Sequence, residues 1–397
     1  MAKRAKVRRI ERLERYLVQI IQEPGADENQ PLAVQLLLVF LSAVSILFRC
    51  AVELRRLFYS AGILRRYPLG CLTISVGNVT AGGTGKTPVV EIFARTLRDE
   101  GRKVAILSRG YRRKEQPFLK RLFSRKAEPP RVVSDGEKVL LNAELGGDEP
   151  YMLATNLPGV CVIVDRNRVK AGRYAVRKFG CDTLILDDGF QYRKLLHSVE
   201  VCLVDKTNPV GNGRMLPRGI LREPASALSR ADYIFITKSN GDSAEVRELV
   251  RSHNKKAEII ECRHAPRVLR GVYSKEELPL EWIAGKTLAT LSGIAVPQGF
   301  ENSLRHLGAR VVYCGRYADH HRYAPSEIAD ALNRARDFGC HALLTTEKDA
   351  VRFPPLENVP VPVYFLRVDI EILAGMENFR HAVSRIVRAA PRGGRAG

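Results

Sequence analysis

The chain has 397 residues, of which 45% are hydrophobic and 27% are charged. This composition excludes a wholly disordered or collagen-like protein, and the length favours roughly two to three domains. Lysine and arginine number 64 against 43 aspartate and glutamate residues, a net charge of +21, which favours an anionic partner: nucleic acid, an acidic membrane surface or a phosphorylated substrate.

The N-terminal part combines a basic extension over residues 1–30 with a long apolar run. Residues 32–48 (LAVQLLLVFLSAVSILF) contain three polar side chains. A helix of this length reaches about 25 Å, the lower limit for crossing a bilayer. The continuation to residue 66 is basic and amphipathic, which is typical of a membrane interface. We therefore predict a membrane anchor over residues 31–66, spanning or embedded; the alternative is a buried core helix.

After residue 70, short β-rich runs alternate with helical lengths. Near-continuous apolar strands indicate parallel sheets covered on both faces, so we predict an α/β fold with mostly parallel sheets. Eleven strands are many for one open sheet, which favours two α/β domains. The predicted strands are 72–76, 104–107, 160–164, 183–186, 199–204, 233–237, 258–262, 287–291, 310–313, 342–345 and 363–368.

A polar, charged stretch within residues 240–275 marks the predicted domain boundary. It gives a first domain over residues 67–245 and a second, smaller domain over 246–385, followed by a disordered tail over 386–397. The eight cysteines include no C-x-x-C pair. This pattern is typical of free thiols in a reducing compartment and argues against a disulfide framework or a zinc site.

The most informative segment is residues 71–97, CLTISVGNVTAGGTGKTPVVEIFARTL, in which a strand leads through a glycine-rich loop into a helix. Glycines let backbone N–H groups turn toward phosphate oxygens, and the helix N-terminus adds its positive dipole end. Strict P-loop spacing requires glycine at position 80, where this chain has threonine. We predict a nucleotide phosphate site at Thr80, Ala81, Gly82, Gly83, Thr84, Gly85, Lys86 and Thr87. The alternative, an ordinary glycine-rich turn, leaves the GKT tripeptide unexplained.

Within this site, Lys86 is placed to reach the β- and γ-phosphates, and Thr87 to bind Mg²⁺. A second strand, TLILDDGFQ, ends in Asp187 and Asp188. Ligands of open α/β sheets gather at the carboxyl ends of strands, so we expect both acids near Thr87, although two acids can also simply open a turn. Phosphoryl transfer also needs a base beside the acceptor hydroxyl. The residues alone leave four candidates open: Asp148, Glu223, His320 and His321.

Together these motifs resemble the tetraacyldisaccharide 4′-kinase family of lipid A biosynthesis, whose glycine loop also has Thr or Ser where strict spacing requires Gly. The resemblance covers residues 55–370. Its segments are VGNVTAGGTGKTPVV (76–90), LSRGYRRK (107–114), GGDEPYML (146–153), VDRNR (164–168), LDDGFQYR (186–193), GNGRMLPRGILREP (211–224), LSGIAVPQGF (291–300), ADHHRY (318–323) and LLTTEKDAVRF (343–353).

The resemblance implies an ATP-dependent lipid kinase that transfers the γ-phosphate of ATP to the 4′-hydroxyl of tetraacyldisaccharide 1-phosphate and so forms lipid IVA. It implies Mg²⁺ as a cofactor and two α/β/α domains, the first P-loop NTPase-like, behind an N-terminal membrane helix. The implied location is the bacterial inner membrane, with the active site on the cytoplasmic face. The implied partners are the lipid A disaccharide precursor and anionic membrane lipids, with no nucleic acid.

The resemblance also implies roles for single residues. The catalytic residues are Asp148 as the base, His320 as its partner, and Lys86. The metal ligands are Thr87, Asp187, Asp188 and Glu223. The substrate residues are Ser108, Arg109, Tyr111, Arg168 and Gln191. The chain departs from the family at Tyr192, where His is usual, and at Ile220, where Pro is common. Because Asp148 and His320 fall in different predicted domains, we expect domain closure to complete the site.

Two other interpretations use the same glycine loop. A basic P-loop ATPase acting on nucleic acid would account for the +21 charge, but the chain has no RNA-binding signature and does contain a near-spanning apolar segment. A nucleotide-dependent membrane scaffold would transfer no phosphate at all. A phosphorylation assay separates all three interpretations.

Overall fold

The computed structural model describes residues 30–110 and 128–388, which form two compact units that interleave along the chain. Unit 1 holds residues 30–109, 167–263 and 372–388. Unit 2 holds Gly110 together with residues 128–166 and 264–371. The division therefore differs from the predicted single boundary: a segment from the middle of the first predicted domain belongs to unit 2, and the last helix belongs to unit 1.

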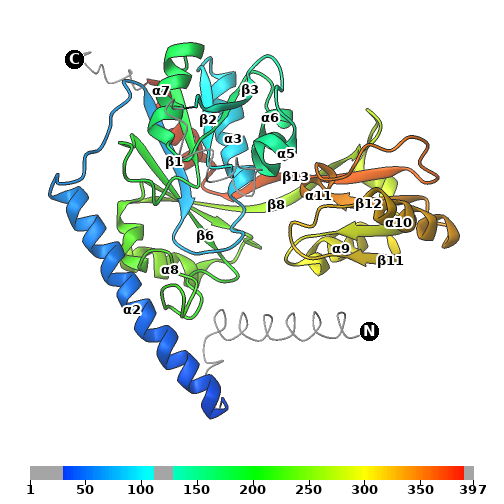
Figure 1. Ribbon diagram of the computed structural model, residues 1–397, viewed down its shortest axis with the longest axis horizontal. Helices are drawn as coiled ribbons and strands as arrows, with labels where there is room; N and C mark the ends of the chain where they lie inside the picture. Colours follow the sequence, from blue (N-terminus) through cyan, green and yellow to red (C-terminus); the bar gives the residue numbers. More distant parts are fainter. Residues whose placement is uncertain (1–29, 111–127, 389–397) are drawn as a thin grey trace. The chain divides into compact units, whose positions relative to one another are not determined.

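Unit 1 is built on a parallel sheet of strands in the order β8-β7-β6-β1-β5-β2, and each of these pairings is parallel. The strands are β1 (Leu72–Asn78), β2 (Val104–Ser108), β5 (Thr183–Asp187), β6 (Val199–Asp205), β7 (Tyr233–Thr237) and the first part of β8 (Glu258–Gly271). The helices are α2 (Leu32–Ser60), α3 (Lys86–Asp99), α7 (Arg168–Phe179), α8 (Ala244–His253), α12 (Met376–Arg388) and the 3₁₀ helix η1 (Ala225–Arg230) (Figure 1).

Side-chain alternation along β7 shows which helices cover which face of this sheet. Ile234 and Ile236 belong to one buried cluster with Val246 and Val250 of α8. Phe235, which points to the other face, packs edge-on against Phe93 of α3 and Phe379 of α12. Successive strand residues face opposite sides, so α8 and the α3–α12 pair lie on opposite faces. Both faces of β7 are covered, as its uninterrupted apolar sequence predicts.

Unit 2 has a parallel sheet in the order β11-β10-β12-β13 and two antiparallel pairs, β3 with β4 and the end of β8 with β9. The strands are β3 (Arg131–Asp135), β4 (Cys161–Val164), β9 (Glu277–Leu278), β10 (Thr287–Ser292), β11 (Arg310–Arg316), β12 (Ala342–Thr346) and β13 (Val363–Ala374). The helices are α5 (Ala143–Gly146), α6 (Asp148–Asn156), η2 (Leu280–Ile283), α9 (Pro297–His306), α10 (Pro325–Asp337) and α11 (Glu347–Ala350).

The predicted fold class is confirmed, and each of the eleven predicted strands is present. The short strands β3 and β9 were not predicted. Strands β8 and β13 run well beyond their predicted ends because each passes from one unit into the other. All eight cysteines are free, as predicted.

Helix α2 begins in the predicted apolar run and continues through the basic segment as one helix of 29 residues. Among the described residues, it is the one helix long and apolar enough to cross a membrane. One side of it packs on unit 1: the Ser45 hydroxyl donates to the Met215 carbonyl at 2.8 Å, and Phe48 and Val52 contact the cluster beneath α8. The other side exposes large apolar residues such as Phe40 and Leu47, so α2 is not a buried core helix.

Candidate active site

The glycine-rich loop joins the end of β1 to the start of α3. Gly82 and Gly85 have φ angles of 114° and 77°, a backbone region that side chains disfavour. Thr80 is not among the described residues with positive φ, which explains why a threonine can replace the glycine of strict P-loop spacing. Helix α3 begins at Lys86 with no acidic residue in its first turn. Its N-terminus therefore offers unopposed N–H groups and a positive dipole end to an anion.

Two polar features line the inside of this loop. The Asn78 amide donates to the carbonyl of Thr80 at 2.7 Å and to its hydroxyl at 3.1 Å, which fixes the entry into the loop. The Thr84 hydroxyl is buried and has no hydrogen-bond partner among the described residues. Buried polar atoms are rarely left unpaired in native proteins. An oxygen of a phosphate bound in this loop would accept a hydrogen bond from the Thr84 hydroxyl.

Lys86 connects this loop to the end of β5. Its ammonium group donates to the Asn78 side-chain oxygen at 3.2 Å and lies 3.7 Å from Asp188 Oδ1. Asp188 has a φ of 52°, unusual for a residue with a side chain, and both its oxygens accept from Arg222, at 3.0 and 2.9 Å. Burial opposes ionisation of Asp188, but the charges of Lys86 and Arg222 outweigh it and hold its pKa below the ordinary value.

Asp187 lies beside β1, in register with Val76, and accepts a hydrogen bond from the Ser108 hydroxyl at 3.2 Å. Arg168 is buried nearby with its guanidinium 5.0 Å from the Tyr192 ring centre. Burial lowers the pKa of Arg168, while Asp187, Tyr192 and Asp188 act to raise it and Arg109 to lower it. The structure thus brings the predicted substrate residues Ser108 and Arg168 close to the two acids.

Tyr192, at the position where the chain departs from the resembled family, contacts Arg168 and the residue before it. Its hydroxyl accepts from the backbone N–H of Arg168 at 3.0 Å and donates to the Asn167 side chain at 3.4 Å. Gln191, the preceding residue, donates from its side chain to the Asn78 carbonyl at 2.9 Å, and its own carbonyl accepts from Arg55 of α2 at 3.3 Å. The end of the predicted membrane helix is therefore in contact with a predicted substrate residue.

Glu223, the fourth predicted metal ligand, is held by two arginines. Its buried carboxylate accepts from Arg230 at 2.6 and 2.9 Å and from Arg193 at 3.3 Å, so two guanidinium groups already satisfy it. Among the described residues, no three His, Cys, Asp or Glu side chains cluster closely enough to hold a metal by themselves. Tyr111, another predicted substrate residue, lies outside the residues that the structure describes.

A second group of predicted residues lies in unit 2. Asp148 is the first residue of α6, and Arg352, which follows α11, donates from Nε to Asp148 Oδ2 at 2.7 Å. The Arg352 side chain is only 1% exposed. His320 has a φ of 64°, and its Nδ1 lies 3.0 Å from Arg352 Nη2 but 3.9 Å from Asp148 Oδ2. Asp148 and His320 are therefore in one unit and are joined by Arg352.

The charge of Arg352 acts on both of its partners. Its Nη2 lies within hydrogen-bond distance of His320 Nδ1, and a guanidinium group can only donate. Burial acts to raise the pKa of Asp148, but nearby His320, the Arg352 hydrogen bond and the charges of Arg352 and Arg322 outweigh it and lower the pKa. Asp148 is therefore ionised at neutral pH, as a general base must be.

Arg352 is itself held by a buried carboxylate. Its Nη1 donates to Asp349 at 3.2 Å, and Asp349 also accepts from the Gly293 N–H at 3.1 Å and the Tyr323 hydroxyl at 3.0 Å. His321, an alternative base from its sequence, is bound to Glu327 at 2.8 Å and stacked on a tyrosine. These contacts favour Asp148 over His321 as the base.

Sequence reasoning missed the two arginines that pair with the predicted acids. Arg222 pairs with Asp188 and Arg352 with Asp148. Both lie inside segments that resemble the kinase family, GILREP and TTEKDAVRF. The two arginines could have been picked out as members of these segments. Their pairing with Asp188 and Asp148 could not, because each arginine is far from its acid in the sequence.

The chain is similar to known proteins over most of its length. A family model described as "Tetraacyldisaccharide-1-P 4'-kinase" matches residues 37–388. The chain is 37% identical to a tetraacyldisaccharide 4′-kinase of Syntrophus aciditrophicus (strain SB) over 383 residues, which cover 92% of this chain and 96% of the relative. It is 39% identical to one of Anaeromyxobacter sp. (strain K) over 350 residues, covering 87% and 89%.

A solved structure, that of LpxK from Aquifex aeolicus in complex with ATP, is also similar. It superposes with a TM-score of 0.70 at 29% identity, covering 88% of this chain and 99% of that chain. The similarity therefore extends over residues from both units.

Proposed function

The chain belongs to the tetraacyldisaccharide-1-P 4′-kinase family, and on that basis we propose how its residues perform the reaction. The protein is a kinase that transfers the γ-phosphate of ATP to the 4′-hydroxyl of tetraacyldisaccharide 1-phosphate to form lipid IVA. Two observations support the residue assignments. The glycine loop has a buried donor with no partner among the described residues and a lysine beside it, and Asp148 is a carboxylate with a lowered pKa that is held by an arginine. Family membership favours this activity over a nucleic-acid ATPase or a scaffold.

The glycine loop and the start of α3 bind the phosphates of ATP in this proposal. The buried Thr84 hydroxyl and the N–H groups of the α3 N-terminus provide hydrogen-bond donors. The Lys86 ammonium group, 3.7 Å from Asp188, binds a phosphate oxygen in place of that carboxylate. A lysine held by a neighbouring carboxylate is kept extended before nucleotide binds. Negative charge that develops on the transferred group is then stabilised by positive groups already in place.

Mg²⁺ fits the residues at the end of β5. The Thr87 hydroxyl and the carboxylates of Asp187 and Asp188 are the oxygen donors that this ion prefers, and it usually takes one or two carboxylates together with phosphate oxygens and water. Glu223 stays in the proposed ligand set: two arginines hold it, but Asp188 is likewise held by Arg222 and close to Lys86. When bound, the ion neutralises charge on the β- and γ-phosphates.

Asp148 is the proposed general base. Its pKa is lowered, so the carboxylate is ready to accept the proton of the 4′-hydroxyl as the phosphoryl group is transferred. Arg352 acts as a positioning residue, because it holds Asp148 Oδ2 with one nitrogen and His320 Nδ1 with another. The predicted pairing of base and histidine therefore works through Arg352 rather than by a direct hydrogen bond.

Ser108, Arg109, Arg168, Gln191 and Tyr111 remain the proposed substrate residues. Arginine can bind a phosphate with two parallel hydrogen bonds, which suits the 1-phosphate of the lipid. The contact from Arg55 of α2 to the Gln191 carbonyl supports this assignment, because a lipid substrate must be recognised beside the membrane helix. We further propose the inner membrane of a bacterium as the location, with the active site on its cytoplasmic face and anionic lipids as partners.

A phosphorylation assay tests the proposal. The purified protein is incubated with γ-labelled ATP, Mg²⁺ and either tetraacyldisaccharide 1-phosphate or nucleic acid. We expect label on the lipid and none elsewhere, and transfer that requires the ion. Release of labelled phosphate without a labelled lipid, or hydrolysis stimulated by nucleic acid, would contradict it.

A further inference from the structure

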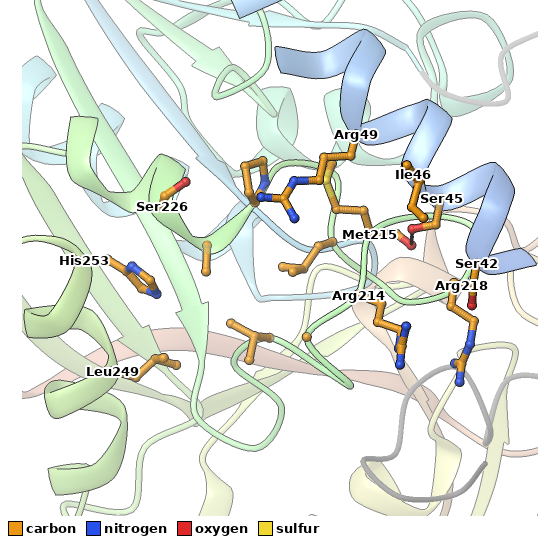
Figure 2. A pocket seen from close by; sticks show the side chains of 15 residues that line it. Ser42, Ser45, Ile46, Arg49, Arg214, Met215, Arg218, Ser226, Leu249 and His253 are labelled. Carbon is orange, nitrogen blue, oxygen red and sulfur yellow. Dashed lines mark hydrogen bonds between the residues drawn. The ribbon is translucent and has the colours of Figure 1, made fainter.

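A cavity of about 530 Å³ lies in unit 1 where α2 meets the segment before η1 and the end of α8 (Figure 2). Residues from all three elements line it: Ser45 and Arg49 from α2, Arg214 and Arg218 from the segment, and Leu249 and His253 from α8. The hydrogen bond from Ser45 to the Met215 carbonyl, 2.8 Å long, fixes the helix against the segment. Helix α2 therefore forms one side of the cavity and is held there by a hydrogen bond.

The polar lining of this cavity is cationic. It includes three arginines and His253, and no aspartate or glutamate. Arg49 and Arg214 make no ion pair with any of the residues that the structure describes. Figure 2 shows the Arg49 side chain extending from α2 into the space toward Ser226, with His253 on the far wall. Arg49 and Arg214 are both exposed and line the same cavity, so their guanidinium groups are free to bind an anionic ligand there.

The remaining lining is apolar, and it is continuous with the exposed side of α2. Ile46 lines the cavity and is 63% exposed, and the adjacent Leu47 is 70% exposed. Met215 and Leu221 form the inner wall. A ligand that matches both parts has an anionic head for the arginines and an apolar tail that follows the exposed side of a membrane helix.

This cavity is separate from the proposed catalytic groups. None of the proposed substrate residues that the structure describes, such as Arg168 and Gln191, lines it. The contact between α2 and Gln191 is made by Arg55, further along the helix. The residues proposed to bind the sugar head of the kinase substrate and the residues that line the cavity are therefore two different sets.

We propose that this cavity binds the phosphate head of an anionic phospholipid, with Arg49 and Arg214 as its main contacts and the acyl chains along the exposed side of α2. The proposal deepens the proposed function, since it rests on the chain acting at a membrane. In this proposal, one lipid of the surrounding bilayer occupies a defined position and fills the space between α2 and the rest of unit 1.

The test counts lipids that stay bound. The full chain is exchanged in detergent with equal amounts of phosphatidylglycerol and phosphatidylcholine, and bound lipids are measured by native mass spectrometry. Arg49→Gln with Arg214→Gln is compared with a control of equal charge change, Arg65→Gln with Lys255→Gln, whose side chains are exposed and do not line the cavity. Both pairs lie on the surface and should fold.

We expect the natural chain and the control to retain one phosphatidylglycerol in preference to phosphatidylcholine, and the cavity variant to bind it about fivefold more weakly for each arginine removed. Equal retention by the cavity variant and the control would overturn the proposal. Displacement of the lipid by glycerol 3-phosphate at comparable concentration would also overturn it, because the site would then recognise phosphate alone.

A parallel turnover assay in detergent keeps this result separate from the kinase assignment. The cavity variant should phosphorylate detergent-dispersed substrate at the natural rate, because its changes lie outside the catalytic groups. Loss of turnover together with loss of bound lipid would show that the substrate itself occupies the cavity and would contradict the assignment to a bilayer lipid. Inactivity of every chain, with lipid retention intact, would instead count against the proposed function alone.

Discussion

At the scale of single residues, the structure adds an arginine partner to Asp188 and another to Asp148. Lys86, Asp187 and Asp188 could be found from sequence because loop and strand–acid motifs are local. Arg352 could not, because its partner Asp148 is 204 residues away, and no spacing rule connects the two. In our proposal, Arg352 joins the base to a histidine that lies 3.9 Å from it.

Replacing Arg352 should separate its positioning role from a purely structural one. Arg352→Met removes the arginine counter-charge from the buried carboxylate of Asp349, at a cost of about 3–5 kcal/mol in the free energy of unfolding. Arg352→Lys should keep the charge and the fold, but a lysine cannot contact Asp148 and His320 with two separate nitrogens. For the lysine variant we expect kcat to fall about 100-fold with little change in the KM for ATP. Because the Asp148 pKa should rise, the acid limb of the kcat–pH profile should move to higher pH.

Steady-state kinetics over a range of pH check this prediction, with circular dichroism as the control for folding. A lysine variant that lost activity with an unmoved acid limb would show that Arg352 only supports the fold.

At the scale of elements, the strands were predicted well because continuous apolar runs between helical lengths leave little choice. The ends of β8 and β13 were predicted less well, because their pairing changes partway along each strand. The division into units was not predictable from a polar boundary, since residues 128–166 join unit 2 through tertiary contacts that leave no local mark. The start of α6, where Asp148 lies, is part of that segment.

The junction of β1 with the segment after β5 offers a test of packing. A Cβ added at Gly77 would lie 2.7 Å from the Cβ of Phe190 and 2.8 Å from its backbone nitrogen, closer than either can yield. Gly77→Ala should therefore lower the free energy of unfolding by about 1–3 kcal/mol. Gly83→Ala, which meets nothing within 4 Å, is the matched control. Urea titration measures both, and equal stabilities would show that the two segments pack less closely than described.

At the scale of the whole molecule, the lowered carboxylate pKa values give the fold a defined response to acid. Asp148 in unit 2 and Asp188 in unit 1 both have pKa values below the ordinary one. A lowered folded pKa adds stability that is present above the unfolded pKa, about 3.9, and is lost as the pH falls through the folded value. Asp188→Asn should therefore make the free energy of unfolding less dependent on pH below about 4. Denaturant titrations across that range would count against the assignment if the dependence were unchanged.

The +21 charge and the apolar side of α2 make different predictions for membrane binding. Attraction of basic residues to anionic lipid is screened by salt, whereas insertion of an apolar helix is not. We expect the full chain to float with phosphatidylglycerol vesicles at both low and high salt. Complete release by high salt would mean that charge alone holds the protein on the membrane and that α2 does not insert.

The most direct test of the central claim is single-turnover transfer from γ-labelled ATP to tetraacyldisaccharide 1-phosphate by the natural chain, Lys86→Ala and Asp148→Asn. We predict that Lys86→Ala forms no labelled lipid, and that Asp148→Asn binds both substrates but transfers the phosphate about 10²–10⁴-fold more slowly. Transfer by Asp148→Asn at the natural rate, or by a folded Lys86→Ala enzyme, would contradict the account.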